Sequence, residues 1–257
     1  MRGSAVRPLL LLASLIAAAP HVAAQTKTGV YRAPRTPDGK PDLEGIWEVR
    51  NTANSNLEAH SASLGIRAGE SVIVDPPDGK IPYQAWAAAK RQENLKTPAA
   101  DPVNKCFLPG VPRITYMPFP FQVFQTPEFV AITYEYVHAS RTVHMKKSGH
   151  LDNIEFWMGD SRGRWEGDTL VVEVANNNAD TWLDSSGNLH SEAMQVVERY
   201  TRTGPDTLQY QATIEDPKVF TRPWTIRMPL YRHTEQNAQL YEYECHVYLE
   251  EAAHPGK

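Results

Sequence analysis

The sequence lacks the motifs of the common cofactor chemistries. It contains no G-x-G-x-x-G before a helix, no P-loop, no H-E-x-x-H and no C-x-x-C, so nucleotide cofactors, zinc hydrolysis and thiol redox chemistry are not expected. Lys and Arg form no cluster and the net charge is −4, which argues against binding to nucleic acid or an anionic membrane. His138, His144 and His150 recur every six residues, roughly 20 Å apart along a strand, which is too wide for one metal ion. We therefore expect no cofactor, no metal site and no nucleic-acid partner.

The chain has one long apolar run, and it lies at the N-terminus. Residues 1–24 carry Arg2 and Arg7, then an apolar run from Leu9 to Ala19, then small residues up to Ala24. This order is typical of a secretory signal peptide that is cut after Ala24, and the run is too short for a transmembrane helix. The sequence thus predicts a bacterial protein that is periplasmic or secreted, without membrane insertion.

Cysteine is scarce, with only Cys106 and Cys245 in the whole chain. An even number of cysteines in an oxidising compartment favours a disulfide. This one would close a loop of about 140 residues and stabilise the fold by roughly 4–5 kcal/mol. The alternative is a pair of buried free thiols on neighbouring strands, because Cys245 lies in a segment that alternates like a strand.

Residues 25–120 are predicted to form an N-terminal arm and a Pro-rich extension. Segments 43–49 and 71–74 resemble short strands, and six prolines between residues 98 and 120 exclude a helix interior or a central strand there. The alanine-rich segment 82–94 is the one predicted helix, with Pro82 in its first turn.

Predicted strands dominate the chain from residue 121 onward. β-branched and aromatic residues recur between short polar breaks in segments 121–125, 129–136, 140–145, 168–174, 193–202, 206–216, 222–232 and 239–249. Closing such a meander removes its unpaired edges. The predicted fold is therefore mainly β: a single antiparallel up-and-down β-barrel, lipocalin-like, of about eight strands over residues 121–257, after the extension with one short helix. A barrel of this size is filled by side chains or holds one small ligand.

Several motifs occur in order along the chain after residue 24. They are PDLEGIW (41–47), CFLPGVPR (106–113), PFPFQVFQTP (118–127), YEYVHASR (134–141), GRWEGDTLVV (163–172) and TWLDSSGNLHSE (181–192). This set resembles a large family of secreted bacterial proteins, with one departure, since relatives are expected to have CLPPG where this chain has CFLPG. The resemblance implies no established reaction, and it suggests only that plant-derived aromatic compounds rank first as substrates.

The last of these motifs holds the first candidate site. Residues 185–188 form a natural turn between Asp184 and His190, so the two side chains can face each other across it. A carboxylate that pairs with an imidazole fixes its tautomer and raises its basicity, as a general base near neutral pH requires. His190 is thus a predicted catalytic base oriented by Asp184. The alternative is a polar loop in which Asp184 caps the turn and His190 is solvated.

A second set of candidates lies on the predicted strands. Arg141 is suited to anchor a carboxylate or phenolate, and His138 or Tyr134 is the predicted acid. A break near His138 would change which of these side chains share a face, and Arg141 has an alternative role in a structural ion pair. Further along, alternation places either Glu198 or Arg199 inside the barrel, where a polar side chain needs a partner or a ligand.

The aromatic residues favour a flat, apolar ligand. Most of them are expected to pack the core, while Trp157, Trp182 and Trp224 are predicted to line a binding cavity. The predicted function is binding of an aromatic or apolar carboxylate or phenol, with a cofactor-free acid–base lyase or isomerase activity. Two alternatives remain open: a non-catalytic periplasmic carrier, and an envelope-associated interaction module that docks through segment 97–120. Homo-oligomers are compatible with the sequence, which does not decide the oligomeric state.

Overall fold

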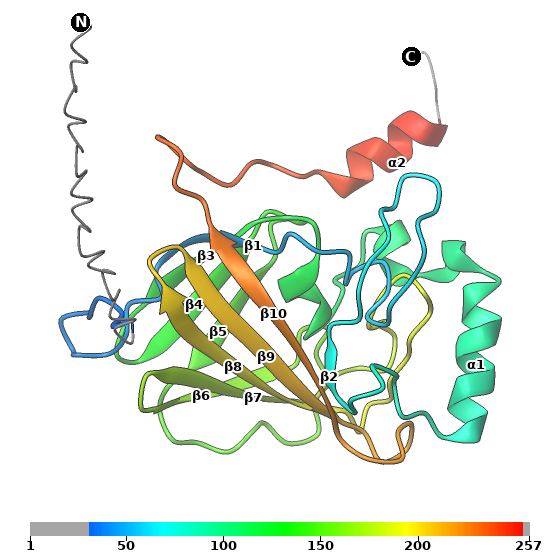
Figure 1. Cartoon of the computed structure of the whole chain (residues 1–257), viewed down its shortest axis with the longest axis horizontal. Coiled ribbons are helices and arrows are strands. Elements are labelled where there is room, and N and C mark those ends of the chain that lie inside the picture. The colour runs from blue at the N-terminus through cyan, green and yellow to red at the C-terminus, as the bar shows by residue number, and fades with distance from the viewer. Residues whose placement is uncertain (1–30, 254–257) are drawn as a thin grey trace, which may run out of the picture. The chain divides into compact units, whose positions relative to one another are not determined.

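Alternating apolar and polar side chains build the strands of this protein, as the sequence predicts. The computed structural model describes residues 31–253 (Figure 1), and the signal peptide predicted over residues 1–24 lies outside them. The strands are β1 (Gly45–Glu48), β2 (Ile73–Asp75), β3 (Phe121–Gln125), β4 (Phe129–Tyr134), β5 (Ser140–His144), β6 (Asp160–Glu166), β7 (Thr169–Ala175), β8 (Gln195–Gly204), β9 (Thr207–Glu215) and β10 (Trp224–Arg232).

Nine of these strands close into a barrel. They follow the order β1, β3, β4, β5, β6, β7, β8, β9 and β10, and β10 returns to pair with β1 through Arg232 and Trp47. Strand β2 adds to β10 outside this closed ring. The prediction of a mainly β barrel is confirmed, and β1 shows that the barrel takes a strand from the segment before residue 121.

One pair of neighbouring strands departs from the antiparallel prediction. Strands β5 and β6 run parallel and share only two pairs of opposite residues, Val143 with Ser161 and His144 with Arg162. The connection 145–159 carries the chain back to the end at which β5 begins, so the barrel is mixed. The first three residues of β5 have no rungs to β6, and this short ladder forms a seam in the barrel wall.

A tight turn between β4 and β5 sets which side chains face the interior. Val137 and His138 adopt left-handed backbone conformations with φ of 45° and 53°, and this break changes the phase of the alternation. Tyr134 and Arg141 are seven residues apart, so a continuous strand would place them on opposite faces. With the turn, both side chains are buried.

Alternation on β8 decides the orientation of the two polar candidates there. Glu198 is fully buried between Val196 and Tyr200, whereas Arg199 points outward and binds Glu166 at 2.7 Å. The interior is otherwise filled by aliphatic and aromatic side chains from all sides of the barrel. The core is thus a packed one with a few polar groups in it.

The predicted helix is present but begins later than expected. Helix α1 spans Ala85–Leu95, because Pro82 and Gln84 are held in extended conformation by backbone hydrogen bonds with Thr221 and Val219. Three short 3-10 helices follow at Pro98–Ala100, Pro102–Lys105 and Arg113–Tyr116. Residues 109–117 are all buried, and the hydroxyls of Thr115 and Tyr200 approach to 3.5 Å. This part of the Pro-rich segment packs into the barrel and is not an exposed docking surface.

The strand predicted over residues 239–249 is wrong. Helix α2 spans Cys245–Ala253 after an extended stretch that follows β10 (Figure 1). Both sides of β10 are already paired, with β9 on one side and with β1 and β2 on the other, so closure leaves no edge there for a further strand. Residues 245–253 therefore form a helix instead of a further strand.

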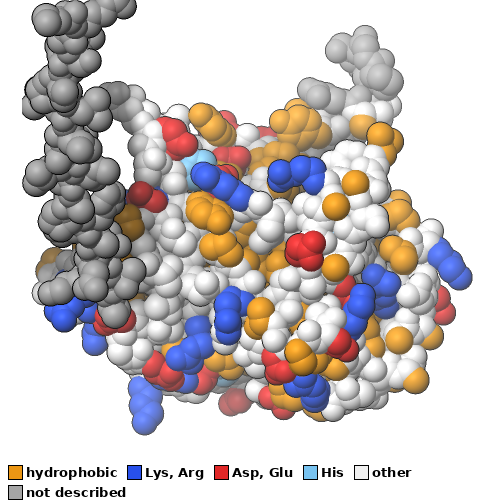
Figure 2. Space-filling view, viewed as in Figure 1, with side chains coloured by type: hydrophobic (Ala, Val, Ile, Leu, Met, Phe, Trp, Pro, Cys, Tyr) orange, Lys and Arg blue, Asp and Glu red, His pale blue; other side chains and the backbone are white. Residues whose placement is uncertain are grey.

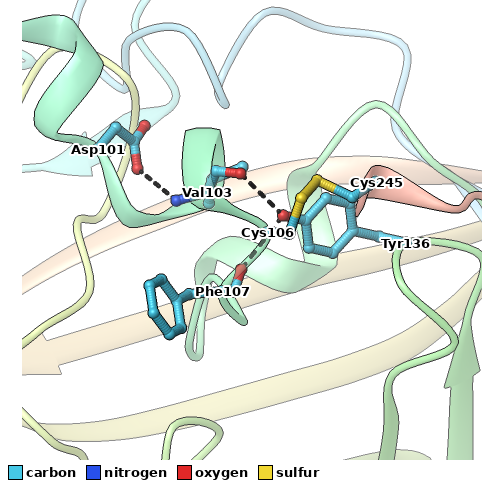
Figure 3. The surroundings of a disulfide bond; sticks show 6 residues. All are labelled: Asp101, Val103, Cys106, Phe107, Tyr136 and Cys245. Atoms are coloured by element: carbon cyan, nitrogen blue, oxygen red, sulfur yellow. Dashed lines mark hydrogen bonds between the residues drawn. A yellow bond between two sulfur atoms is a disulfide. The ribbon is translucent and has the colours of Figure 1, made fainter. Parts of the chain in front are cut away.

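The predicted disulfide is present and anchors α2. Cys106 and Cys245 are bonded, and the hydroxyl of Tyr136 lies 3.2 Å from the carbonyl oxygens of both Val103 and Phe107 (Figure 3). Tyr243 forms an isolated bridge with Tyr136 and stacks on it with ring centroids 5.6 Å apart. The disulfide thus joins the C-terminal segment to the loop that carries Phe107.

The surface has mixed charge. On the face shown in Figure 2, Lys and Arg side chains are interspersed with Asp and Glu. Among the helices of residues 31–253, none has both the length and the hydropathy needed to cross a membrane.

Candidate functional site

A pocket of about 480 Å³ opens at the seam where β5 and β6 diverge. Its wall consists of the first half of β5, the segment 155–162 that leads into β6, and two apolar side chains, Leu108 and Leu151. We call it the seam pocket. It contains two residues predicted from the sequence to bind a ligand, Arg141 and Trp157.

Arg141 links the seam pocket to the barrel interior. Its side chain is 2% exposed and forms a buried ion pair with Glu198 through Nη2, while Nε donates to Ser161 Oγ at 2.8 Å. Nη1 is also buried and has no hydrogen-bond partner in the part of the chain that the structure describes. Arg141 therefore forms a structural ion pair, the alternative that the sequence left open, with a carboxylate 57 residues away, and one nitrogen of the guanidinium remains unpaired.

Glu198 is held from its other side by two tyrosines. The hydroxyls of Tyr200 and Tyr210 donate to Glu198 Oε1 at 3.0 and 2.8 Å. Burial raises the pKa of both tyrosines well above the ordinary value, and the adjacent carboxylate raises it further. These hydroxyls are therefore donors at any physiological pH, and their hydrogen bonds stabilise the charge of Glu198 within the core.

Tyr134, the predicted acid, belongs to the same buried cluster. Burial raises its pKa to about 12, against the charge of Arg141, which lowers it. Its hydroxyl is buried beside Arg141 and Thr115, which both lower its pKa, but within residues 31–253 none of its contacts has the geometry of a full hydrogen bond. A phenol with this pKa holds its proton near neutral pH, so the structure favours a neutral Tyr134.

A histidine and a carboxylate meet beside the seam pocket. His150 Nδ1 lies 3.0 Å from Asp160 Oδ2, and the same oxygen accepts from Arg162 Nε and Nη2 at 3.0 and 2.8 Å and from the amide of Leu151 at 3.2 Å. Burial alone would raise the pKa of Asp160, but these hydrogen bonds outweigh it and hold the pKa below its ordinary value. Asp160 is thus an ionised carboxylate in the pocket wall.

Trp157 forms an apolar side of the pocket. Its ring stacks on Phe107 with centroids 4.9 Å apart and an interplanar angle of 3°, and Phe156 and Met158 beside it line the same pocket. Because Phe107 follows Cys106 directly, the disulfide helps to position this stack (Figure 3).

The other two predicted tryptophans lie elsewhere. Trp224 is fully buried in the core, edge-on to Phe220 with centroids 5.4 Å apart. Trp182 forms an isolated bridge with Leu189, and neither tryptophan lines the seam pocket. Trp224 packs the core, and Trp182 lies in the turn region opposite Leu189.

Asp184 and His190 do not form the predicted pair. Asp184 accepts from the amides of Leu57 and Ser186 at 2.8 and 2.9 Å and from Asn188 Nδ2 at 2.6 Å. The carboxylate is fully buried, and burial raises its pKa in spite of these donors. Asp184 therefore stabilises the turn over residues 184–188 and links it to the backbone of Leu57.

His190 has partners of its own. Nδ1 donates to the carbonyl of Ser191 at 2.9 Å, so Nε2 is the nitrogen that accepts from the Thr181 hydroxyl at 2.6 Å. Burial lowers the pKa of His190 and keeps it neutral. Both ring nitrogens are engaged and the side chain is buried, so His190 is neither a solvated loop residue nor a base at the seam pocket.

His138 and Arg199 lie on the surface. His138 Nε2 is 2.7 Å from Glu244 Oε1, with about half of each side chain exposed. Arg199 binds Glu166 on the outside of the barrel. Neither lines the seam pocket, because the turn at 137–138 and the alternation of β8 direct them away from the interior.

A buried ion pair that the sequence patterns do not indicate fixes the Pro-rich segment. Arg113 donates to both carboxylate oxygens of Asp101 at 2.9 and 2.8 Å, and also to Asn54 and Ser185 at 2.9 Å each. Its position at the end of the CFLPGVPR motif was the one available signal. Through these contacts the pair joins the Pro-rich segment to residue 54 and to residue 185, and its role is structural.

Residues 159–163 read GDSRG, which fits the G-x-S-x-G pattern of serine hydrolases. That pattern requires a strand-to-helix turn with an exposed serine. Here Ser161 lies within β6, is buried, and accepts from Arg141. The local structure therefore does not form a nucleophile elbow.

Within residues 31–253, no three His, Cys, Asp or Glu side chains are grouped so that they could hold a metal ion. Neither a family model nor a curated protein matches the chain.

Proposed function

We propose that the protein is an exported binding protein for small aromatic or apolar carboxylates and phenols, and that the seam pocket holds them. The observation that carries this proposal is the buried guanidinium of Arg141, which lines the pocket and has Nη1 unpaired. A buried donor without a partner costs about 1–3 kcal/mol. An anionic oxygen of a ligand would supply the missing partner through a charge-assisted hydrogen bond.

The pocket wall supports the aromatic part of the ligand. Trp157, Phe156, Met158 and Leu108 offer apolar surface, and a volume of about 480 Å³ lies within the usual range of small-molecule sites, about 300–1,000 Å³. A single aromatic ring with one anionic group therefore satisfies both the wall and Arg141.

Thermal unfolding of the chain without its signal peptide tests this function. Benzoate and 4-hydroxycinnamate should stabilise it by about 2.7 kcal/mol at 100 times their dissociation constants, a rise in Tm of roughly 5–10 °C for a domain of this size. Benzyl alcohol has the ring but no acidic group and should stabilise the protein much less. Equal shifts for all three compounds, or none, would contradict the role of Arg141.

Two variants locate the ligand. Trp157→Leu removes the aromatic wall and should weaken binding at least about tenfold, which is a loss of about 1.4 kcal/mol. The double variant R141M/E198Q removes the anion handle without leaving a buried charge, and should abolish the preference for benzoate over benzyl alcohol. Arg199→Gln, on the outer face, is the matched control and should bind as the native protein does.

Binding is better supported than the acid–base catalysis predicted from His190 and His138, because neither residue lines the seam pocket. A carrier would release its ligand unchanged. Prolonged incubation with 4-hydroxycinnamate, followed by chromatography, separates a carrier from a lyase or isomerase by the absence or appearance of a product.

Export of the protein, and its place among the secreted bacterial proteins that it resembles, are part of the same proposal. The signal peptide pattern of residues 1–24 and the disulfide support it. Osmotic-shock fractions of expressing cells should contain a chain that begins at Gln25. A full-length chain confined to the cytoplasm would refute export.

A further inference from the structure

The seam pocket has a second ionisable feature that anion binding alone does not require, the pair formed by His150 and Asp160. We propose that His150 is a general base that removes the hydroxyl proton of a phenol bound in the seam pocket, with Asp160 as its positioning residue. This inference rests on the proposed binding function and names the residue that would give the site its chemistry.

The hydrogen bonds of Asp160 fix the tautomer of His150. Asp160 is ionised and accepts from Arg162 and from the Leu151 amide through the oxygen that faces His150. An ionised carboxylate can only accept, so His150 Nδ1 must carry a proton. In the neutral imidazole the lone pair is then on Nε2, which has no hydrogen-bond partner among the described residues. This nitrogen is free to accept a proton.

His150 lies next to the pocket and remains accessible. Its side chain is 27% exposed, and both the carboxylate that holds it and the following residue, Leu151, belong to the pocket wall. A base needs to come within about 3 Å of the proton that it removes. Because Nδ1 is the nitrogen that contacts Asp160, Nε2 is the nitrogen left for this contact.

The proton transfer balances without any co-reactant. The O–H bond of the phenol breaks, its electron pair stays on oxygen, and an N–H bond forms at His150 Nε2. A neutral phenol and a neutral imidazole thus become a phenolate and an imidazolium. Asp160 faces the imidazolium, and Arg141 offers its unpaired Nη1 to an anionic group of the ligand.

Other charged groups near the pair define the pH behaviour. Arg162 shares Asp160 with His150, and the carboxylate orients the imidazole ring. Glu155 and His144 line the same pocket. His144 has no carboxylate partner in the described chain, which makes it a matched control for His150.

Spectrophotometric titration of bound 4-nitrophenol tests the proposal, because its phenolate absorbs visible light. The protein is held in excess, and binding is followed separately by quenching of tryptophan fluorescence. The bound phenol should ionise about ten times more readily than the free one, which is a fall of about one unit in its apparent pKa. His150→Asn should remove most of this shift and change the dissociation constant by less than about threefold. His144→Asn should keep the shift in apparent pKa, and His138→Asn, at a surface histidine outside the pocket, should leave both the shift and the dissociation constant unchanged.

The outcomes distinguish this inference from the binding function. If 4-nitrophenol binds to the native protein and to His150→Asn with the same apparent pKa, the base is refuted and the binding function stands. If the shift in apparent pKa is lost in His144→Asn and kept in His150→Asn, His144 is the base and the proposal is overturned. No binding to the native protein would refute both. Asp160→Asn reports on positioning: an amide can accept from or donate to Nδ1, so part of the shift should be lost and the pH profile should broaden.

Discussion

Replacement of Glu198 by Gln tests the buried ion pair behind the seam pocket. The side chains of Glu198 and Arg141 are 0% and 2% exposed, so solvent does not screen their charges. Gln keeps the shape, and its carbonyl can still accept from Tyr200 and Tyr210, but it leaves the guanidinium of Arg141 buried without a counter-charge. Breaking a buried pair in this way costs about 3–5 kcal/mol.

Urea unfolding followed by tryptophan fluorescence measures this loss. In thermal unfolding, the Tm should fall by roughly 6–20 °C, because each kcal/mol lost lowers the Tm of a domain of this size by about 2–4 °C. Arg199→Gln, one residue along the same strand, removes an exposed pair with Glu166 and should leave the stability nearly unchanged, because water and salt screen it.

A double variant separates the charge from the packing. R141M/E198Q leaves no charge at this buried pair and keeps the acceptor for both tyrosines, so it should be more stable than E198Q alone, with a coupling of a few kcal/mol. A loss of less than about 1 kcal/mol in E198Q would refute the reasoning. So would a double variant whose loss equals the sum of the two single losses.

Four further predictions concern the rest of the molecule. The double variant C106S/C245S removes a crosslink between residues 139 positions apart, and its free energy of unfolding in reversible urea unfolding should be lower by roughly 4–5 kcal/mol. A loss below about 1 kcal/mol would mean that the crosslink does not constrain the unfolded chain. Burial lowers the pKa of His190, so its contribution to stability is present above the unfolded value of 6.5 and is lost as the pH falls; His190→Gln should flatten Tm between pH 7 and about 5, and an unchanged slope would contradict this. Burial raises the pKa of Tyr134 to about 12, so the contribution of this phenol to the free energy of unfolding is fully present below about pH 10 and is lost as the pH rises toward 12. Tyr134→Phe should reduce this alkaline loss. Because the hydroxyl forms no full hydrogen bond in residues 31–253, the variant should change the stability at pH 7 by less than about 1 kcal/mol. Asp184→Asn places an amide donor among groups that donate to Asp184, and should cost about 1–3 kcal/mol at pH 7, whereas a stabilised variant would show that the buried charge outweighs its hydrogen bonds.

Local patterns were enough to predict most of the strands, because alternation with a period of two is a property of neighbouring residues. The same reasoning limited Glu198 and Arg199 to opposite faces and marked Arg141 as an anion handle by residue type. The disulfide could also be favoured without any geometry, since two cysteines in a chain with a predicted signal peptide allow only one intramolecular bond. In each of these cases the deciding information lies within a few residues or in a simple count.

The candidate site depended on contacts between distant segments. Asp184 and His190 are close in sequence, yet they do not bind each other. Asp184 accepts a hydrogen bond from the amide of Leu57, and His190 contacts the hydroxyl of Thr181. Conversely, His150 and Asp160 were not predicted as a pair, because the sequence shows no reason for the connection 145–159 to fold back onto the start of β6.

The sequence by itself predicted a mainly β barrel, favoured a disulfide between Cys106 and Cys245, and marked Arg141 and Trp157 as candidate binding residues by their residue type. Only the tertiary structure decided that β1 closes the barrel, that residues 245–253 form a helix, and that β5 and β6 run parallel. The physical reason is common to all three: each depends on which strand edges are already paired, and an edge is created or removed by strands that are distant in the sequence. The seam pocket exists where one such ladder is only two residue pairs long.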